Sequence, residues 1–175
     1  AGKDVIAKAK TGSGKTAAFG IGLLSQLDAA ALRLQALVLC PTRELADQVA
    51  KELRRLARFT ENIRVLTVCG GVPFGPQLGS LEHGAHIVVG TPGRLLDHLR
   101  RGSLDLSALQ TLVLDEADRM LDMGFQDDIR SLIAAAPVRR QTLLFSATYP
   151  DTIAEMSAAI QHGPVEVSVD EEHEA

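Results

Sequence analysis

The fold is decided by the stretch Val5-Ile6-Ala7-Lys8-Ala9-Lys10-Thr11-Gly12-Ser13-Gly14-Lys15-Thr16, in which a short apolar run leads into a glycine-rich turn. The residues that follow are rich in Ala, Leu and Ile and are typical of a helix. Glycines let the backbone turn tightly and aim successive N–H groups at a phosphate chain, and the start of a helix adds a partial positive charge. The stretch therefore predicts a phosphate-binding turn between a strand and a helix.

This turn supplies the candidate residues for binding ATP and Mg²⁺. Lys15 can reach the β- and γ-phosphates, and the Thr16 hydroxyl can ligate Mg²⁺. The predicted nucleotide-binding residues are Ala9, Thr11, Gly12, Ser13, Gly14, Lys15 and Thr16. Ala9 stands where the strict pattern has glycine, which keeps the small size but reduces backbone freedom. The alternative is a glycine-rich turn beside a surface lysine, and the strand before and the helix after argue against it.

Outward from this turn, short apolar runs alternate with helical patterns along the chain. The runs cover 36–40, 65–68, 86–89, 111–114 and 141–145, and the alternating run 165–169 predicts an edge strand. Such alternation predicts βαβ units in a three-layer α/β domain with a mostly parallel central sheet. Ligands of open parallel sheets bind at the carboxyl ends of the strands, so we expect the functional residues directly after the apolar runs. We predict a loop over 70–76 and a frayed acidic end without function over 170–174.

Composition agrees with one globular domain over residues 1–175. Hydrophobic residues make up 46% and charged residues 23%, and Trp is absent, so Ala, Val, Ile and Leu must form the core. The net charge of −4 argues against a broad basic surface but leaves room for local phosphate contacts.

Cys40 and Cys69 end apolar runs, which favours buried free thiols over a disulfide or a ligand pair. The chain shows neither a transmembrane stretch nor a signal peptide, and we expect a cytoplasmic protein without membrane partners.

An acidic cluster follows the run Leu112-Val113-Leu114 and reads Asp115-Glu116-Ala117-Asp118. A carboxylate at the end of a buried strand is costly unless it meets a cation, and Mg²⁺ on a triphosphate would supply one to Asp115. Glu116 could then orient or deprotonate an attacking water. A short acidic cluster is otherwise a solvated turn or a helix N-terminus. Beside the phosphate-binding turn, it predicts Glu116, Asp115 and Lys15 as the catalytic set.

Six motifs in order, AKTGSGKT, PTRELA, GG, TPGR, DEAD and SAT, resemble the first RecA-like domain of DEAD-box RNA helicases over essentially the whole chain. The longer stretches AAFGIGLL, ALVLCPTRELADQVA, TPGRLLDHL and DEADRMLDMGF are most similar to the bacterial DbpA subfamily. The resemblance implies a RecA-like P-loop NTPase fold. It also implies an RNA-dependent ATPase that couples ATP hydrolysis to local unwinding of RNA duplexes, in the assembly of ribosomal RNA into ribosomes.

The resemblance further implies a set of RNA-binding residues, namely Pro41, Thr42, Arg43, Gly71, Thr91, Pro92 and Arg94. Thr91 suits a helix N-cap and Pro92 the first helical position, which leaves a free helix N-terminus near an arginine. Contacts of this kind hold the phosphates and 2′-hydroxyls of single-stranded RNA without reading its bases. From the residues alone, helix capping with arginines in surface ion pairs remains the alternative.

Coupling between ATP hydrolysis and strand separation is implied for Asp118, Ser146 and Thr148. The two hydroxyls could bond to Asp118, and a local turn made by the serine and threonine is the alternative. We interpret Met120, Met123 and Phe125 as packing residues.

The resemblance also implies partners beyond this chain. We expect an N-terminally truncated domain, because the adenine-recognising segment, the second RecA-like domain with its arginine fingers and a C-terminal RNA-binding domain are not in the sequence. Arginine fingers contribute several orders of magnitude to turnover, so the isolated chain is expected to be nearly inactive. Two other classes remain open: a DNA helicase or transport ATPase, and a non-catalytic clamp or scaffold for RNA or protein.

Overall fold

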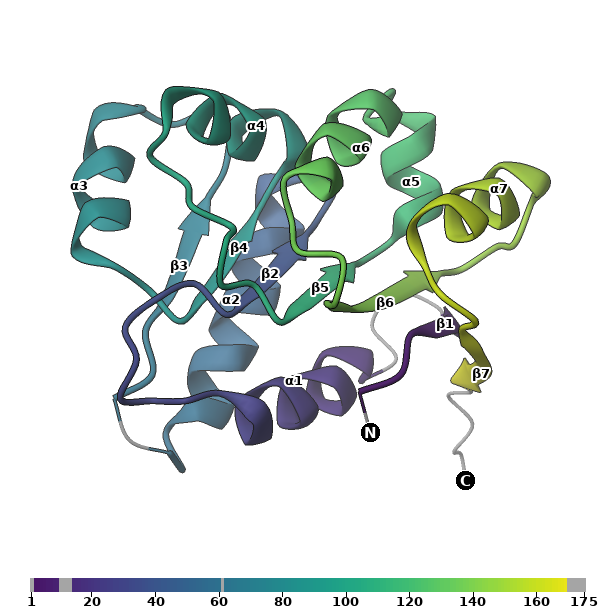
Figure 1. The fold of residues 1–175 in the computed structure, drawn as a ribbon, viewed down its shortest axis with the longest axis horizontal. Helices are drawn as coiled ribbons and strands as arrows, with labels where there is room; N and C mark the ends of the chain where they lie inside the picture. The colour runs from purple at the N-terminus through teal and green to yellow at the C-terminus, as the bar shows by residue number, and fades with distance from the viewer. Residues whose placement is uncertain (1, 10–13, 61, 170–175) are drawn as a thin grey trace.

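In a computed structural model, residues 2–9, 14–60 and 62–169 are described and form a seven-stranded parallel sheet (Figure 1). The strands lie in the order β3-β4-β2-β5-β6-β1-β7. They are β1 (Val5–Ala9), β2 (Ala36–Leu39), β3 (Val65–Val68), β4 (Ile87–Gly90), β5 (Thr111–Leu114), β6 (Gln141–Ser146) and β7 (Val165–Val169). Every predicted apolar run is a strand, and the predicted α/β class is confirmed.

Helices cover both faces of this sheet and give the domain three layers. In Figure 1, α1 (Lys15–Gln26) and α2 (Arg43–Ala57) lie below the sheet. Above it lie α3 (Gly75–His83), α4 (Pro92–Arg101), α5 (Ala117–Asp122), α6 (Gln126–Ala134) and α7 (Asp151–Ile160). Both sides of the sheet are therefore buried, which is why its strands are continuously apolar.

Two apolar clusters form the core, one on each face of the sheet. Successive side chains of a strand point to opposite faces. In β2, Leu37 and Leu39 join the cluster under α4 to α7, while Val38 joins the cluster against α1 and α2. All three side chains are fully buried. Small and branched residues thus fill the core without tryptophan, as the composition predicts.

The carboxyl ends of the central strands are aligned by the sheet register. The backbone N–H of Asp115 donates to Leu39 O (2.9 Å), and that of Cys40 donates to Gly90 O (2.9 Å). At the next strand along, Thr91 N–H donates to Val68 O (3.2 Å). The residues that follow β2, β3, β4 and β5 therefore meet at one edge of the sheet, where the sequence places its motifs.

The predictions of a loop over 70–76 and of a packing role for Met123 are wrong, whereas the predicted edge strand is confirmed. The loop predicted over 70–76 is shorter, because Gly75 and Pro76 already form the first turn of α3, where proline is well tolerated. Met120 is buried and Phe125 packs against the core, but Met123 is 48% exposed and does not pack as predicted. The edge position of β7, which pairs with β1, is confirmed.

Cys40 and Cys69 are free, buried thiols, as predicted. Burial raises the pKa of Cys40 well above its ordinary value, and burial raises that of Cys69 to about 11. Both thiols therefore stay protonated and serve as small apolar groups. Within the described residues, no helix has the length and apolarity needed to cross a bilayer.

Candidate nucleotide and nucleic-acid site

A buried lysine and two buried carboxylates form the centre of the candidate nucleotide site. Lys15 is the first residue of α1, directly after Gly14, whose φ of 78° lies in the left-handed region. Lys15 Nζ lies 2.7 Å from Asp115 Oδ1 and 3.8 Å from Glu116 Oε2. Asp115 and Glu116 directly follow β5, so the sheet brings the predicted catalytic set together.

Desolvation is the dominant electrostatic influence on Asp115. Burial raises the pKa of its carboxyl group above the ordinary value, whereas the Lys15 ammonium lowers it and Glu116 raises it again. An unpaired carboxylate with 3% of its residue surface exposed would be costly, and the ion pair with Lys15 offsets that cost. If Lys15 paired with a triphosphate in place of Asp115, the buried Asp115 carboxylate would need another cation.

Glu116 has a backbone conformation that L-residues adopt rarely. Its φ of 56° and ψ of 53° are left-handed, and it is the N-cap residue directly before α5. Such a conformation costs about 1–3 kcal/mol and is concentrated at functional sites. It turns the chain sharply between β5 and α5 and keeps Glu116 beside Lys15 and, at 3.7 Å, Arg119.

The three residues border a pocket of about 280 Å³ that can hold phosphate groups. Thr16 also borders it, so a hydroxyl and the Asp115 carboxylate are available to one cation. Among the described residues, no cluster of three His, Cys, Asp or Glu could hold a metal alone. Oxygen ligands of this kind fit Mg²⁺, which binds through one or two carboxylates together with substrate phosphates. Thr11, Gly12 and Ser13 lie outside the described residues.

A hydrogen-bonded link joins the acidic cluster to the end of β6. Asp118 Oδ2 accepts hydrogen bonds from the backbone N–H of Thr148 (3.2 Å) and from its hydroxyl (2.9 Å). The predicted bond from Ser146 is wrong: its hydroxyl is buried and has no hydrogen-bond partner in the described part of the chain. Ser146 is still part of β6, whereas Thr148 lies beyond the end of the strand, after a bend at Ala147, and it is Thr148 that reaches Asp118.

A second group of predicted residues meets where β2 and β3 end. Thr42 caps α2, since its Oγ1 accepts the backbone N–H of Leu45 (3.2 Å). The next residue, Arg43, is exposed and lies close to Gly71: a Cβ added there would be 3.9 Å from Arg43 Nη1. Gly71 has a left-handed φ of 81°, which favours glycine. Pro41 is buried directly before the cap.

The start of α4 completes this group at the end of β4. Pro92 is the first residue of the helix, as predicted. Thr91 stands at the N-cap position, but its hydroxyl does not cap the helix as expected; it accepts the backbone N–H of Gly70 (3.1 Å). Arg94 Nη1 donates to Val72 O (3.0 Å). The TPGR and GG motifs are thus bonded to each other.

Three residues in this group were missed from the sequence: Phe74, Gln77 and His98. The Gln77 amide accepts from both Arg94 and His98, and the His98 ring stacks on Phe74. Gln77 and Cys69 also border a pocket of about 290 Å³ beside Arg43. An isolated Gln or His on a helix carries no motif, so only the observed packing of α3 against α4 identifies them.

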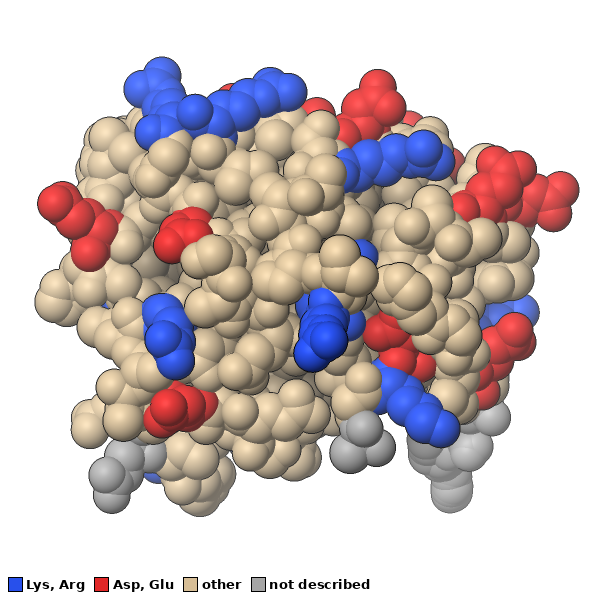
Figure 2. Space-filling view, viewed as in Figure 1, with Lys and Arg blue, Asp and Glu red and all other residues tan. Residues whose placement is uncertain are grey.

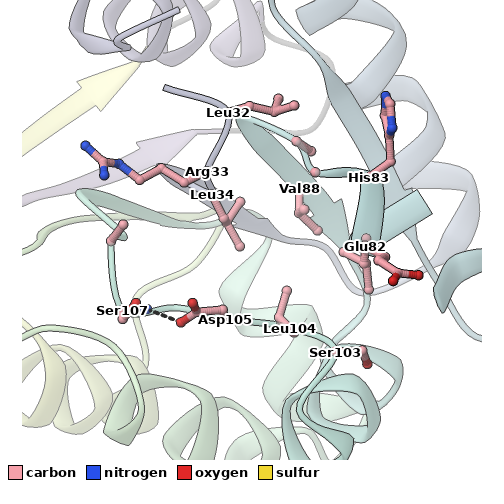
Figure 3. A pocket seen from close by; sticks show the side chains of 14 residues that line it. Leu32, Arg33, Leu34, Glu82, His83, Val88, Ser103, Leu104, Asp105 and Ser107 are labelled. Atoms are coloured by element: carbon pink, nitrogen blue, oxygen red, sulfur yellow. Dashed lines mark hydrogen bonds between the residues drawn. The ribbon is translucent and has the colours of Figure 1, made fainter. Parts of the chain in front are cut away.

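A hollow of about 460 Å³ lies at the opposite edge of the sheet (Figure 3). Leu34, Val88 and Leu104 form its apolar wall, and Arg33 and Asp105 are at its rim. It is bordered by segments that precede β2, β4 and β5, and none of the predicted site residues borders it. The candidate chemistry is therefore at the carboxyl edge, as expected for a parallel sheet.

Charge is distributed in small groups on the surface. In the view of Figure 2, lysine and arginine side chains are interspersed with acidic ones and form no continuous basic face. The net charge is −4. Any nucleic acid that binds here would therefore depend on local groups such as Arg43 and Arg94 and not on the overall field.

Comparison with known proteins places these motifs in one family. A family model described as DEAD/DEAH box helicase matches residues 1–156. The chain is 65% identical over 170 residues to the ATP-dependent RNA helicase DbpA of Escherichia coli, a match that covers 97% of this chain and 37% of that protein. It is 51% identical to the ATP-dependent RNA helicase CshA of Listeria monocytogenes, with 93% and 31% covered. The chain thus spans about a third of the length of these relatives.

A solved structure agrees with the sequence comparison. The fold matches the crystal structure of a DEAD box protein from the hyperthermophile Methanococcus jannaschii with a TM-score of 0.91 at 40% identity, over 96% of this chain and 46% of that one. The expected RecA-like fold is thereby confirmed. Motifs, fold and site geometry agree, and the chain belongs to the DEAD/DEAH box helicase family.

Proposed function

We propose that this chain is the first RecA-like domain of an ATP-dependent RNA helicase, in which ATP hydrolysis drives local unwinding of RNA duplexes. The observation that carries the proposal is the buried ion pair of Lys15 with Asp115 beside Glu116, at the carboxyl edge of the sheet. A buried cation next to a phosphate-sized pocket is poised to exchange its carboxylate partner for a triphosphate.

In this proposal the chain's own residues bind and orient ATP. Lys15 would contact the β- and γ-phosphates in place of Asp115, and Asp115 and Thr16 would hold Mg²⁺, directly or through water. When bound, Mg²⁺ neutralises charge that develops on the phosphate oxygens. Glu116 orients the attacking water and accepts its proton. Ala9 and Gly14 are proposed to contact the phosphates as well, and the sequence motif alone extends this proposal to Thr11, Gly12 and Ser13.

RNA binding is proposed for the group at the ends of β2, β3 and β4. Arg43 and Arg94 would contact phosphates, with Gly71 allowing close approach of the backbone. Pro41, Thr42, Thr91 and Pro92 fix the two helix starts that carry these arginines. Such contacts do not read bases, so we expect binding without sequence preference. Asp118 and Thr148, which are bonded to each other, would transmit the state of the ATP site to this face.

The complete activity is proposed for a longer protein. The relatives are about three times as long as this chain, which leaves room for a second RecA-like domain that supplies arginine fingers and the other half of the RNA groove. We propose a cytoplasmic protein that acts on ribosomal RNA during ribosome assembly, as the resemblance to DbpA implies.

The test is the ATPase rate with and without single-stranded RNA, measured on this chain and on the full-length protein. We expect RNA to stimulate the full-length protein and Glu116→Gln to abolish that stimulation. This chain alone should be slower by about three orders of magnitude or more, because in this proposal the second RecA-like domain supplies the arginine fingers. An equal response to DNA would favour a DNA helicase. RNA binding without hydrolysis in the full-length protein would favour a clamp.

A further inference from the structure

Gln77 is a buried amide on α3 that joins three separate segments. Its Nε2 donates to the carbonyl oxygen of Cys69 (3.0 Å), directly before the GG motif. Its Oε1 lies 3.0 Å from Arg94 Nη1 and 2.8 Å from His98 Nε2. One side chain therefore connects the end of β3 to two successive turns of α4.

His98 completes the connection from inside α4. It has no exposed surface. Because Gln77 Oε1 is the acceptor, His98 Nε2 carries the proton, and Nδ1 accepts from the Ser103 hydroxyl, 2.7 Å away. The imidazole ring is stacked on Phe74, the N-cap residue directly before α3, with centroids 4.0 Å apart and planes at 5°. Ring stacking and hydrogen bonding thus hold α3 and α4 in one relative position.

Arg94 is held by this network at one nitrogen. Nη1 donates to both Gln77 Oε1 and Val72 O, each at 3.0 Å. Within the described part of the chain, Arg94 makes no hydrogen bond through Nη2 or Nε, so these donors remain available to a ligand. Its guanidinium also lies 5.4 Å from the centre of the Phe74 ring. The side chain is fixed at one end and presents the rest of its planar fork, the geometry that suits a phosphate.

We propose that Gln77 and His98 are positioning residues for RNA: they hold Arg94 and the turn 70–72 in the arrangement that binds the phosphate backbone. The inference rests on the proposed function and extends it to residues outside every motif. A side chain placed in advance loses less conformational entropy on binding, so removal of either partner should weaken RNA binding although neither touches RNA.

The chain contains a matched pair for comparison, Gln35 and His86. Gln35 is 1% exposed and makes three hydrogen bonds through its amide. His86 is also 1% exposed, accepts the backbone N–H of Arg64 and lies 3.0 Å from Ala29 O. Both directly precede strands, at the opposite edge of the sheet from Arg94. They reproduce the burial and bonding of Gln77 and His98 without contact to the proposed RNA face.

The experiment uses the full-length protein and four variants: Gln77→Met and His98→Phe, with Gln35→Met and His86→Phe as controls. For each, urea unfolding gives stability, and fluorescence anisotropy gives the Kd for single-stranded RNA over a range of salt concentrations. All four should lose stability, because each leaves buried polar groups unpaired. Only Gln77→Met and His98→Phe should raise the RNA Kd, by about tenfold, the equivalent of one lost charge-assisted hydrogen bond.

Two further readouts separate positioning from stability. The slope of log Kd against log salt should shrink by about 0.7 in Gln77→Met and in His98→Phe, since one phosphate contact to a single strand is lost. His98→Gln, which keeps a donor near the Nε2 position, should recover part of the affinity. The RNA concentration for half-maximal ATPase should rise in parallel with Kd.

Equal RNA affinity in Gln77→Met and Gln35→Met, at similar stability, would overturn the inference. An unchanged slope of log Kd against log salt in His98→Phe would also overturn it. This second measurement tests the inference even if Gln77→Met does not fold. If the unmutated protein neither binds RNA nor responds to it in the ATPase assay, the proposed function fails instead, so the two failures are distinguishable.

Discussion

At the scale of single residues, Lys15 is the cation on which the candidate active site depends. Lys15→Met should abolish ATP binding and lower the free energy of unfolding by about 3 kcal/mol at neutral pH, because the buried Asp115 loses its partner. Lys15 lowers the Asp115 pKa, which burial already raises above the ordinary value, so the variant raises it further.

A group whose folded-state pKa is raised contributes most to stability at low pH, and that contribution is lost as pH rises through the folded pKa. The destabilisation by Lys15→Met should therefore be smaller at about pH 5 than at about pH 8, because at the lower pH more of the Asp115 carboxyl in the variant is protonated and uncharged. Urea unfolding of the wild type and the variant at both pH values measures this. Lys15→Met added to an Asp115→Asn background is the control, and the change in the free energy of unfolding that it causes there should be the same at both pH values. A loss of the same size at both pH values would contradict the ion-pair interpretation.

His98 is the second residue whose charge can be followed. Its pKa lies below the ordinary value of 6.5, chiefly because the ring is buried and also because Arg94 and Arg101 are near, with Asp97 acting in the opposite direction. Since the folded-state pKa is lowered, the unfolded chain takes up a proton first as pH falls below 6.5.

The stability contributed by neutral His98 is thus present above 6.5 and is lost as pH falls toward the lowered pKa. The free energy of unfolding should decrease over that window in the wild type, and the decrease should be smaller in His98→Phe. NMR titration of the ring protons provides a direct check, with a midpoint expected below 6.5. A midpoint at or above 6.5 would mean that the ring is not buried as described.

At the scale of elements, Gly90 lies where β3, β4 and α4 approach one another closely. A Cβ at this position would lie 2.2 Å from the carbonyl oxygen of Val68 in β3 and 3.0 Å from Leu95 in α4. Gly90→Ala should therefore cost more than about 2 kcal/mol, because the nearest atom is backbone and cannot move aside as a side chain can.

Gly22→Ala is the matched control for this change. Gly22 is an exposed residue inside α1, and a Cβ there meets nothing within 4 Å. It should stabilise the protein by about 0.5–1 kcal/mol through helix propensity. Chemical denaturation of both variants measures the contrast. A mild effect of Gly90→Ala would mean that β3 and β4 are not held as closely at their carboxyl ends as the register indicates.

Element types were predictable because burial on both faces makes each strand a continuous apolar run. The start of α3 was not, since Gly75 and Pro76 follow other turn-forming residues and only the packing of Gln77 shows that the helix has begun. Gln77 and His98 could not be identified as site residues from the sequence, because they lie on α3 and α4 and their contact depends on how these two helices pack. The sequence also does not show where β6 ends, and Thr148, beyond that end, bonds to Asp118 whereas Ser146, inside the strand, does not.

At the scale of the whole molecule, the parallel sheet explains why motifs distant in sequence form a common site. Parallel strands deliver their carboxyl ends to one edge, so Lys15, Asp115, Arg43 and Arg94 lie along that edge by topology alone. The sequence order of apolar runs and motifs was enough to predict this. What it could not supply is the bonding between motifs, such as Thr91 to Gly70 and Arg94 to Val72.

The whole-molecule charge gives the last prediction, on how RNA affinity of this chain depends on salt. A chain of net charge −4 does not attract RNA by its overall field, so we expect the phosphate contacts to come from Arg43 and Arg94, the two arginines of the proposed site. Each phosphate neutralised on a single strand contributes about 0.7 to the slope of log Kd against log salt, and two contacts predict about 1.4.

Anisotropy titrations of this chain with single-stranded RNA at several salt concentrations measure the slope. Arg43→Ala and Arg94→Ala should each lower it by about 0.7, whereas Arg139→Ala, at the opposite edge of the sheet, should leave it as it is. A slope well above 2 would point to a larger basic surface than Arg43 and Arg94 provide.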